Sequence, residues 1–410
     1  MTNERKNLLL LPWEYPYRPG EAPFIEPELA ALSEEFNVRI AACLNDGTPT
    51  DNPVPCPVPF APAGKASAFS GVLDVLTDGD FWREFFTIFK GAKGKLPRRL
   101  GFLFYNYLHA HRFARSLERN LLPSFRPDVV YSFWGRETAY TARLLKKRLP
   151  GVKIASRFHR FDLYENRSPL GFLPFRPALN RALDAFLFIS NEGRSYYRAK
   201  NPLAPQEKMH TLYLGCTPSP CRANPDFGRF VIVSCSRVMP EKRLRLLVDA
   251  LSRVEGVNID WHHMGGGENL DALKAYAALR LGEKSNVNSV FHGTLENSAL
   301  RPLYRALGAR LLVNVSSSEG LPVTMMEAFS MGLPALGTDV GGVSEIVTEK
   351  TGVLLDADPS PEAIAAALIA FSKRPKADWL LLSEAAGALW AESFNSERNA
   401  ARTASFLAGL

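Results

Sequence analysis

NVSSSEGLPVTMMEAFSMGLPALGTDVGGVSEIV, residues 314–347, is the most informative stretch of this chain. Its first residues end an apolar run, and a loop leads from them into a helix that stops near Gly332 and Pro334. The short apolar run at 333–337 then predicts a buried strand. Strand, loop, helix and strand form one turn of an α/β unit, and open parallel sheets bind ligands at the carboxyl ends of their strands.

Two glutamates in this stretch, Glu319 and Glu327, are separated by seven residues. The spacing predicts that Glu319 lies in the loop and Glu327 a turn inside the helix, on one wall of a cleft. A carboxylate accepts hydrogen bonds from two hydroxyls, which suits a sugar or a ribose. The backbone of Gly320, Leu321 and Pro322 at the helix start would face an anion. The alternative is a helix N-terminus with acidic side chains that compensate its dipole.

Two further groups follow predicted strands in the second half of the chain. Arg237 comes directly after the apolar run RFVIVSCS, and Lys242 stands where a helix begins. Two cations at a strand end would neutralise a diphosphate and stabilise it as it leaves, although either residue alone is typical of a solvated surface. The run MGGGENL places Gly266 in a triple glycine, which lets a ligand approach the backbone closely but does not match the GxGxxG dinucleotide pattern.

The first half carries a polar and aromatic turn, SRFHRFDLY, residues 156–164, directly after a strand. His159 and Asp162 lie in it, and two arginines beside His159 favour an anionic ligand. A single histidine is more often structural. The long loop after the first strand, PWEYPYRPGEAPFIEPE, contains Gly20, and long loops at this position tend to be functional.

Strands recur with helices of about a dozen residues between them, which predicts βαβ units and mainly parallel sheets. Asn7–Leu11 and Asn37–Leu44 are predicted strands with a helix at Pro27–Glu35 between them, and the Pro-rich segment 46–65 is an irregular connection. With 410 residues and 46% hydrophobic composition the chain can form two cores. We expect an N-terminal domain at 1–205, a C-terminal domain at 206–384, and a helix at about 385–410.

The net charge of +7 comes from one segment, residues 82–119, which has nine Lys/Arg, two acids and nine aromatics. It has three interpretations: a helical pair on an anionic membrane surface, a nucleic-acid site, or helices with a buried aromatic face and a solvated basic one. We favour the membrane and expect no nucleic acid. The absence of a membrane-spanning run and of a signal peptide, with five scattered cysteines, predicts a cytoplasmic protein that is peripheral to the membrane.

Together these stretches resemble the retaining GT-B glycosyltransferases of group 1, or family 4, whose hallmark is two glutamates seven residues apart. Besides residues 314–347, the matching stretches are SCSRVMPEKRLRLLVDAL, MGGGENLDAL, VFHGTLENSALRPLY and SRFHRFDLYENRSPLGFLPF. They lie in both halves of the chain, in the family's order. The lead YPYRPGEAPFIEPELAALSEEFNV is similar to members that build bacterial surface polysaccharides.

The resemblance implies two Rossmann-like domains that face each other across a cleft, with the C-terminal helix returning to the N-terminal domain. Glu327 would hold the ribose of a nucleotide-diphosphate sugar and Glu319 its sugar. Arg237 and Lys242 would bind the diphosphate, helped by Gly320, Leu321 and Pro322, and His159 would lie near the reaction centre. A hexose would pass with retention to a glycan or lipid-linked glycan. One departure is the first loop, which has Gly20 followed by Glu21 where many members have two glycines.

No cofactor or metal is implied. Asp356 and Asp358 form an Asp-x-Asp, a metal signature of another glycosyltransferase fold, but the cations above already serve the diphosphate. The rival functions are a nucleotide-sugar epimerase or dehydrogenase, which the missing GxGxxG disfavours, and a catalytically silent sugar-nucleotide-binding scaffold.

Overall fold

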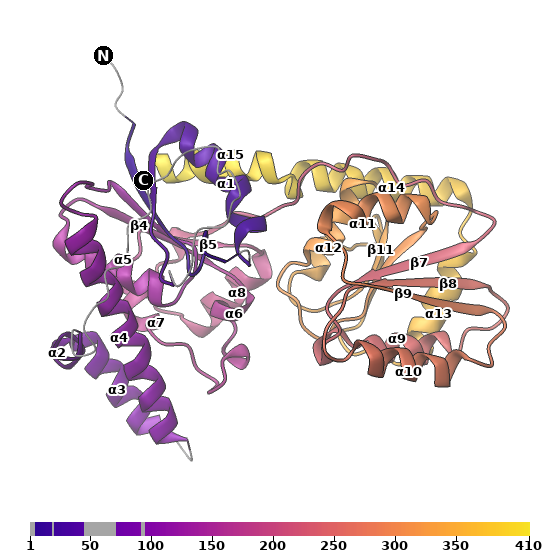
Figure 1. Ribbon diagram of the computed structural model, residues 1–410, viewed down its shortest axis with the longest axis horizontal. Coiled ribbons are helices and arrows are strands. Elements are labelled where there is room, and N and C mark those ends of the chain that lie inside the picture. The colour runs from indigo at the N-terminus through magenta and orange to yellow at the C-terminus, as the bar shows by residue number, and fades with distance from the viewer. Residues whose placement is uncertain (1–4, 19, 45–70, 92–94) are drawn as a thin grey trace. The chain divides into compact units, whose positions relative to one another are not determined.

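The computed structural model describes residues 5–18, 20–44, 71–91 and 95–410, so the Pro-rich connection predicted at 46–65 lies outside the described residues. The chain divides into two compact units (Figure 1). Unit 1 comprises Met1–Leu214 and Glu397–Leu410, and unit 2 comprises Gly215–Ser396. The predicted α/β class with two Rossmann-like, parallel-sheet domains is confirmed.

Unit 1 is built on a parallel sheet with the order β2-β1-β3-β4-β5-β6. Its strands are β1 (Asn7–Leu11), β2 (Asn37–Ile40), β3 (Val129–Ser132), β4 (Lys153–Phe158), β5 (Ala185–Phe188) and β6 (Met209–Thr211). Successive residues of a strand point to opposite faces. Leu8 and Leu10 therefore enter one core, and Leu9 and Leu11 enter the other. The uninterrupted leucine run of β1 thus reflects a sheet that is covered on both faces.

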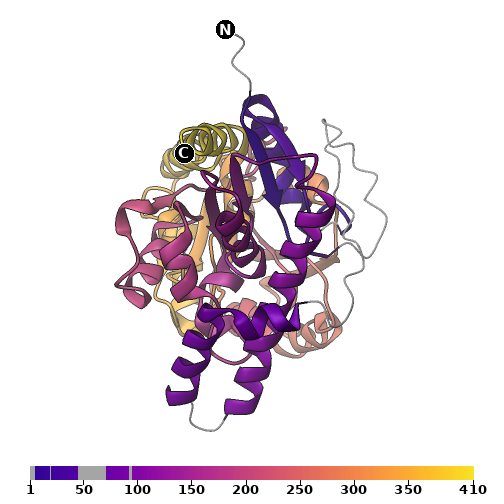
Figure 2. The same cartoon turned by 90° about the vertical axis from the view of Figure 1, so that its left-hand side faces the viewer.

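The helices of unit 1 cover these two faces and extend beyond them. They are α1 (Ala22–Glu35), α2 (Val72–Thr77), α3 (Gly79–Gly91), α4 (Leu96–Asn120), α5 (Glu137–Arg148), α6 (Arg160–Leu163), α7 (Arg176–Ala182), α8 (Asn191–Lys200) and α15 (Ser396–Ala408). Helix α1 begins earlier than the predicted Pro27, with Pro23 in its first turn, where the missing N–H costs nothing. Helices α3 and α4 lie side by side and project from the sheet (Figures 1 and 2).

Unit 2 has a second parallel sheet with the order β12-β11-β10-β7-β8-β9. Its strands are β7 (Phe230–Cys235), β8 (Ile259–Met264), β9 (Val287–Gly293), β10 (Leu311–Asn314), β11 (Ala335–Thr338) and β12 (Gly352–Leu355). Its helices are α9 (Leu244–Leu251), α10 (Leu270–Leu281), α11 (Asn297–Ala306), α12 (Val323–Ser330), α13 (Pro361–Ser372) and α14 (Lys376–Leu389). Strands β10, β7 and β8 are neighbours, so the loops that follow them meet at one edge.

The C-terminal helix α15 is part of unit 1. Ala404 and Leu407 lie in the same core as Leu8 and Leu10. A fully buried arginine of β4, Arg157, pairs with Glu28 of α1 and donates from Nη2 to Thr403 Oγ1 at 3.1 Å. Its Nε also donates to the hydroxyl of Tyr131 at 2.6 Å and its Nη1 to the carbonyl of Leu212 at 3.0 Å. This buried polar cluster ties the helix to three parts of the unit.

Candidate active site

Glu319 lies in the loop after β10, where it pairs with Lys242. Its Oε1 is 2.6 Å from Lys242 Nζ and accepts a hydrogen bond of 3.1 Å from Asn314 Nδ2. Only 6% of Glu319 is exposed, while 21% of the Lys242 side chain remains accessible. The structure therefore places these two predicted residues in direct contact, with the Lys242 side chain partly open to solvent. Asn314 was missed by the sequence analysis, although a polar residue ending an apolar strand is a usable signal.

Arg243, next to Lys242, braces the same loop. Its guanidinium donates to the carbonyls of Val315 at 2.6 Å and Ser316 at 3.0 Å. It also pairs with Asp358 at 2.8 Å. The sequence carries no signal for this role, because a third basic residue in PEKR reads as one more surface charge. Asp358 thus has a basic partner, and the described residues contain no group of His, Cys, Asp or Glu that could hold a metal ion.

The loop between the two glutamates is held by a glycine pair after β11. Gly341 has a φ of +56°, and a Cβ there would lie 2.0 Å from the carbonyl oxygen of Glu319. The N–H of Gly342 donates to the carbonyl of Gly320 at 2.7 Å. Leu321 and Pro322 are buried, and α12 begins directly after Pro322. Backbone contact between the two loops therefore sets the conformation of residues 319–322.

Glu327 lies inside α12 and is 4% exposed. Its Oε1 accepts a hydrogen bond of 2.6 Å from Asn297 Nδ2, which comes from α11. Burial raises the pKa of the Glu327 carboxyl, while the Asn297 hydrogen bond and the charge of Arg301 act in the opposite direction. Arg301 itself donates to the carbonyl of Thr217 at 2.7 Å. Glu327 is therefore a buried carboxylate that a hydrogen bond from Asn297 orients.

Arg237 and Gly266 lie at the same edge, after β7 and β8. Arg237 is exposed. The carbonyl of Gly266 accepts from the N–H of Val238 at 2.8 Å, so the two loops are joined. A Cβ at Gly265 would lie 1.9 Å from the carbonyl oxygen of Ser236. At least this glycine of the triple run is thus required by contact between strand-end loops, independently of any ligand.

In unit 1, His159 follows β4 and is the first residue before α6. It is 8% exposed and lies against Trp134, with ring centroids 4.4 Å apart. Neither ring nitrogen has a hydrogen-bond partner among the described residues. Burial lowers the pKa of His159 well below its usual value, and the charge of Arg157 adds to this. The imidazole is therefore neutral, with one donor and one acceptor that are both buried.

Asp162, predicted to bind substrate, is completely buried. Its Oδ1 accepts from the N–H of His159 at 2.6 Å and its Oδ2 from the N–H of Gly135 at 2.5 Å. Burial raises the pKa of Asp162 to about 6, against the lowering effect of these hydrogen bonds and of Arg176. In this geometry Asp162 positions the His159 backbone and joins it to the loop after β3, and it presents no accessible oxygen.

In the first loop, which contains Gly20, the side chain of Glu21 accepts hydrogen bonds from the loop's own backbone. The carboxylate of Glu21 accepts from the N–H groups of Trp13 at 3.1 Å and of Glu14 and Tyr15 at 2.7 Å each. It also accepts from the indole of Trp134. Glu21 is 4% exposed, and its carboxylate occupies the N–H groups that a bound anion would need. Gly20 itself is exposed.

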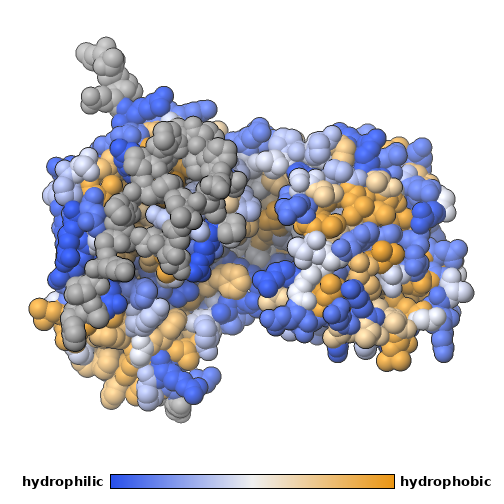
Figure 3. Space-filling model, in the orientation of Figure 1, coloured by the Kyte–Doolittle hydropathy of each residue, from blue (hydrophilic) through white to orange (hydrophobic). Residues whose placement is uncertain are grey.

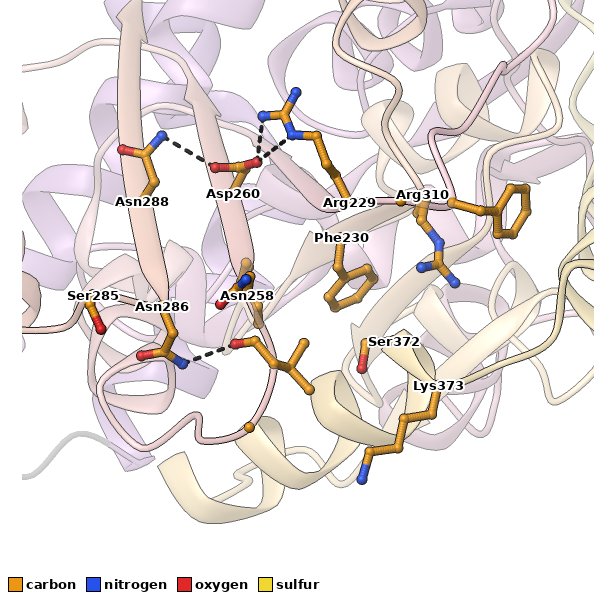
Figure 4. A pocket seen from close by; sticks show the side chains of 15 residues that line it. Arg229, Phe230, Asn258, Asp260, Ser285, Asn286, Asn288, Arg310, Ser372 and Lys373 are labelled. Atoms are coloured by element: carbon orange, nitrogen blue, oxygen red, sulfur yellow. Dashed lines mark hydrogen bonds and ion pairs between the residues drawn. The ribbon is translucent and has the colours of Figure 1, made fainter.

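A separate cavity of about 650 Å³ lies at the opposite edge of the unit 2 sheet (Figure 4). It is lined by residues that precede the strands, among them Arg229, Asn258, Asn286 and Arg310. Asp260 pairs with Arg229 there at 2.5 Å. None of the predicted site residues lines this cavity, so it is distinct from the candidate site.

Comparison with known proteins identifies the fold. The fold is GT-B, two Rossmann-like domains, as in the lipopolysaccharide outer core galactosyltransferase WaaB (TM-score 0.71, 15% identity, 98% of this chain and 100% of that one). Anabaena Alr3699/HepE in complex with UDP and glucose is also similar (TM-score 0.67, 15% identity, 99% and 100%). Residues 229–374, all within unit 2, match the family Glycosyl transferases group 1.

Among curated relatives, the putative colanic acid biosynthesis glycosyltransferase WcaL of Escherichia coli (strain K12) is 26% identical over 263 residues, which are 61% of this chain and 62% of that protein. The O-antigen biosynthesis glycosyltransferase WbnH of Escherichia coli is 30% identical over 135 residues, 33% of this chain and 36% of that protein. The matches therefore span less than two thirds of these relatives.

Proposed function

We propose that this protein is a retaining, metal-independent glycosyltransferase that moves a hexose from a nucleotide-diphosphate sugar to a hydroxyl of a glycan. The observation that carries the proposal is the pair of buried carboxylates, Glu319 and Glu327, on the loop and helix after β10, with Lys242 in contact with one of them. Carboxylates bind hydroxyls and an accessible ammonium group binds phosphate, which together match a nucleotide sugar.

In the proposed reaction the acceptor oxygen bonds to the anomeric carbon as the bond to the diphosphate breaks on the same face. The acceptor proton passes to an oxygen of the leaving phosphate, so no enzymic nucleophile is needed. Arg237 and Lys242 stabilise the charge that develops on the diphosphate. Glu319 orients the sugar, Glu327 holds the ribose, and the neutral His159 hydrogen-bonds a sugar hydroxyl near the reaction centre.

The setting we propose is bacterial surface polysaccharide assembly, with a lipid-linked acceptor at the inner face of the plasma membrane. Support comes from the relatives, which are named for colanic acid, O-antigen and lipopolysaccharide core biosynthesis. Among the described residues no helix is both long enough and apolar enough to cross a membrane.

The test is a thermal-shift screen of nucleotide sugars, followed by donor turnover with the pure protein. UDP-sugars are used first, because a solved protein of this fold holds UDP-glucose. A ligand that binds only the folded state raises the unfolding temperature. We expect Glu319→Ala to suppress transfer and Glu327→Ala to weaken nucleotide binding. Full transfer by both variants would contradict the assignment, and binding without turnover would favour the silent scaffold.

A further inference from the structure

Helices α2, α3 and α4 of unit 1 carry an unusual exposed surface. Five of the eleven large hydrophobic side chains that are exposed in the described parts of the chain lie there: Leu73, Leu76, Phe86, Phe89 and Tyr105, which are 47–70% exposed. Away from these helices, Phe161 is the one exposed aromatic among the described residues. Figure 3 shows hydrophobic residues over α3 and α4 at the lower left.

The aromatic rings on α3 form a continuous row. Trp82 and Phe85 have ring centroids 5.2 Å apart, and Phe85 contacts Phe86 at 5.6 Å and Phe89 at 6.3 Å. The inner member of the set, Phe81, packs into the core against Tyr107. One side of α3 therefore packs against the core, while a second aromatic side faces outward.

The acidic side chains of these helices are all engaged within unit 1. Asp78 accepts from His111 and Tyr140, and Glu84 accepts from Tyr107 at 2.9 Å and from the N–H of Phe175 at 3.0 Å. Asp80 pairs with Arg143 and Arg181, Asp74 with Arg115, and Glu118 with Arg148. Asp78, Asp80 and Glu84 are also buried.

The exposed charged side chains along α3 and the first turn of α4 are consequently cationic: Lys90, Lys95, Arg98 and Arg83, of which Arg83 also pairs with Asp80 at 3.5 Å. The sequence predicted that basic residues outnumber acidic residues in this segment. The structure adds that the acids are paired within unit 1, so along α3 and the first turn of α4 the exposed charged groups are cations that lie beside exposed aromatic rings. A merely solvated basic face does not need Phe86 and Phe89 on its surface.

We infer that helices α2–α4 form a lipid-docking surface, in which Phe86 and Phe89 enter the head-group layer of a membrane and the surrounding cations bind anionic lipid. Aromatic residues and Lys/Arg on one amphipathic element are what an anionic bilayer surface retains. The surface is also tied to the candidate site. Asn106 of α4 accepts at 3.2 Å from Arg136, two residues after Trp134, whose ring contacts His159.

This inference rests on the proposed function in one respect only: an acceptor held at a membrane would explain why the protein binds lipid. Its test needs neither donor nor acceptor. The full chain is mixed with vesicles of phosphatidylcholine, with or without an equal part of phosphatidylglycerol, and floated on a density gradient. We expect flotation with the anionic vesicles and little without them.

Two sets of variants separate the contributions. Phe86→Ser with Phe89→Ser should lower the partition coefficient about 20-fold, because roughly half of each ring is exposed and would be buried in lipid. Lys90→Gln, Lys95→Gln and Arg98→Gln together should lower it about 100-fold, at about fivefold for each charge. The matched controls are Leu279→Ser and Lys350→Gln in unit 2, which are exposed and should leave it unchanged.

Several outcomes overturn the inference. The inference is wrong if the wild-type protein stays at the bottom of the gradient. It is also wrong if Phe86→Ser with Phe89→Ser leaves flotation unchanged. If those substitutions instead convert a dimer to a monomer in gel filtration, the surface is an interface between copies of the chain. The thermal response to UDP is measured on every variant, so failure of the proposed donor site and failure of lipid docking are read separately.

Discussion

Glu327→Gln tests the ribose assignment with the smallest change in shape. The amide oxygen of glutamine can still accept the 2.6 Å hydrogen bond from Asn297, so α11 and α12 should stay in place. What is lost is the negative charge of the carboxylate that we assign to two ribose hydroxyls. A variant that removes charge and keeps volume separates binding from folding.

The expected magnitude follows from the number of hydrogen bonds. A hydrogen bond to a charged group contributes about 1.5–3 kcal/mol and a neutral one about 0.5–1.5 kcal/mol, a difference of roughly 1 kcal/mol for each hydroxyl. Two hydroxyls give about 2 kcal/mol, or roughly a 30-fold increase in the dissociation constant for UDP. Because burial raises the pKa of Glu327, the carboxylate gains a proton at a higher pH than an ordinary glutamate. Wild-type affinity should therefore fall toward that of the variant as the pH drops.

Isothermal titration calorimetry with UDP at pH 7.5 and 5.5 measures both effects. The control is Glu349→Gln, which changes an exposed carboxylate in a turn of unit 2 and should bind like wild type. Equal affinity of wild type and Glu327→Gln at pH 7.5, in a variant that unfolds at the wild-type temperature, would refute the assignment.

Gly341→Ala should weaken UDP binding more than tenfold, since its Cβ would lie 2.0 Å from the Glu319 carbonyl oxygen; Gly256→Ala, with a φ of +70° and open space, shares the backbone strain and should bind normally. Burial raises the pKa of Glu84 from 4.5 to about 7, so the folded state keeps a proton that the unfolded state releases. Stability should thus fall as pH rises between these values, by on the order of 3 kcal/mol, and Glu84→Gln should lose that part of the pH dependence in thermal unfolding. Arg157→Met should destabilise unit 1 by about 3–5 kcal/mol and speed hydrogen exchange in α15, because it leaves Glu28 buried and unpaired. Arg253→Met, which breaks an exposed ion pair with Glu362, should leave stability nearly unchanged, and equal losses in the two variants would contradict the reasoning.

Hydrophobic period and turn residues were enough to predict the parallel sheets and the strand-end position of Glu319, Arg237 and Gly266. These depend on local alternation, which a single sequence displays. The pairing of Glu319 with Lys242 joins residues 77 positions apart and depends on how two loops settle at one edge. No local pattern encodes it.

Burial was the other property that the sequence did not reveal. Asp162 and Glu21 are polar residues in loops next to aromatic residues, which is typical of ligand-facing groups. Both instead hold backbone N–H groups inside unit 1. Whether a loop carboxylate serves a ligand or its own backbone depends on the tertiary position of the amides around it, and the three N–H groups at Trp13–Tyr15 converge only after β1 and α1 are in place.

The helix α15 has a consequence for biosynthesis. Thr403, Ala404 and Leu407 are translated after all of unit 2, yet they complete the buried cluster at Arg157 and the core around Leu8. Unit 1 therefore leaves the ribosome about 180 residues before its last part is made, with Arg157 short of one partner and an apolar strip uncovered. A nascent chain in this state exposes apolar surface, which favours aggregation. A fragment that ends at Leu214 would keep this defect permanently, so unit 1 can be produced alone only if residues 397–410 are rejoined to it through a linker.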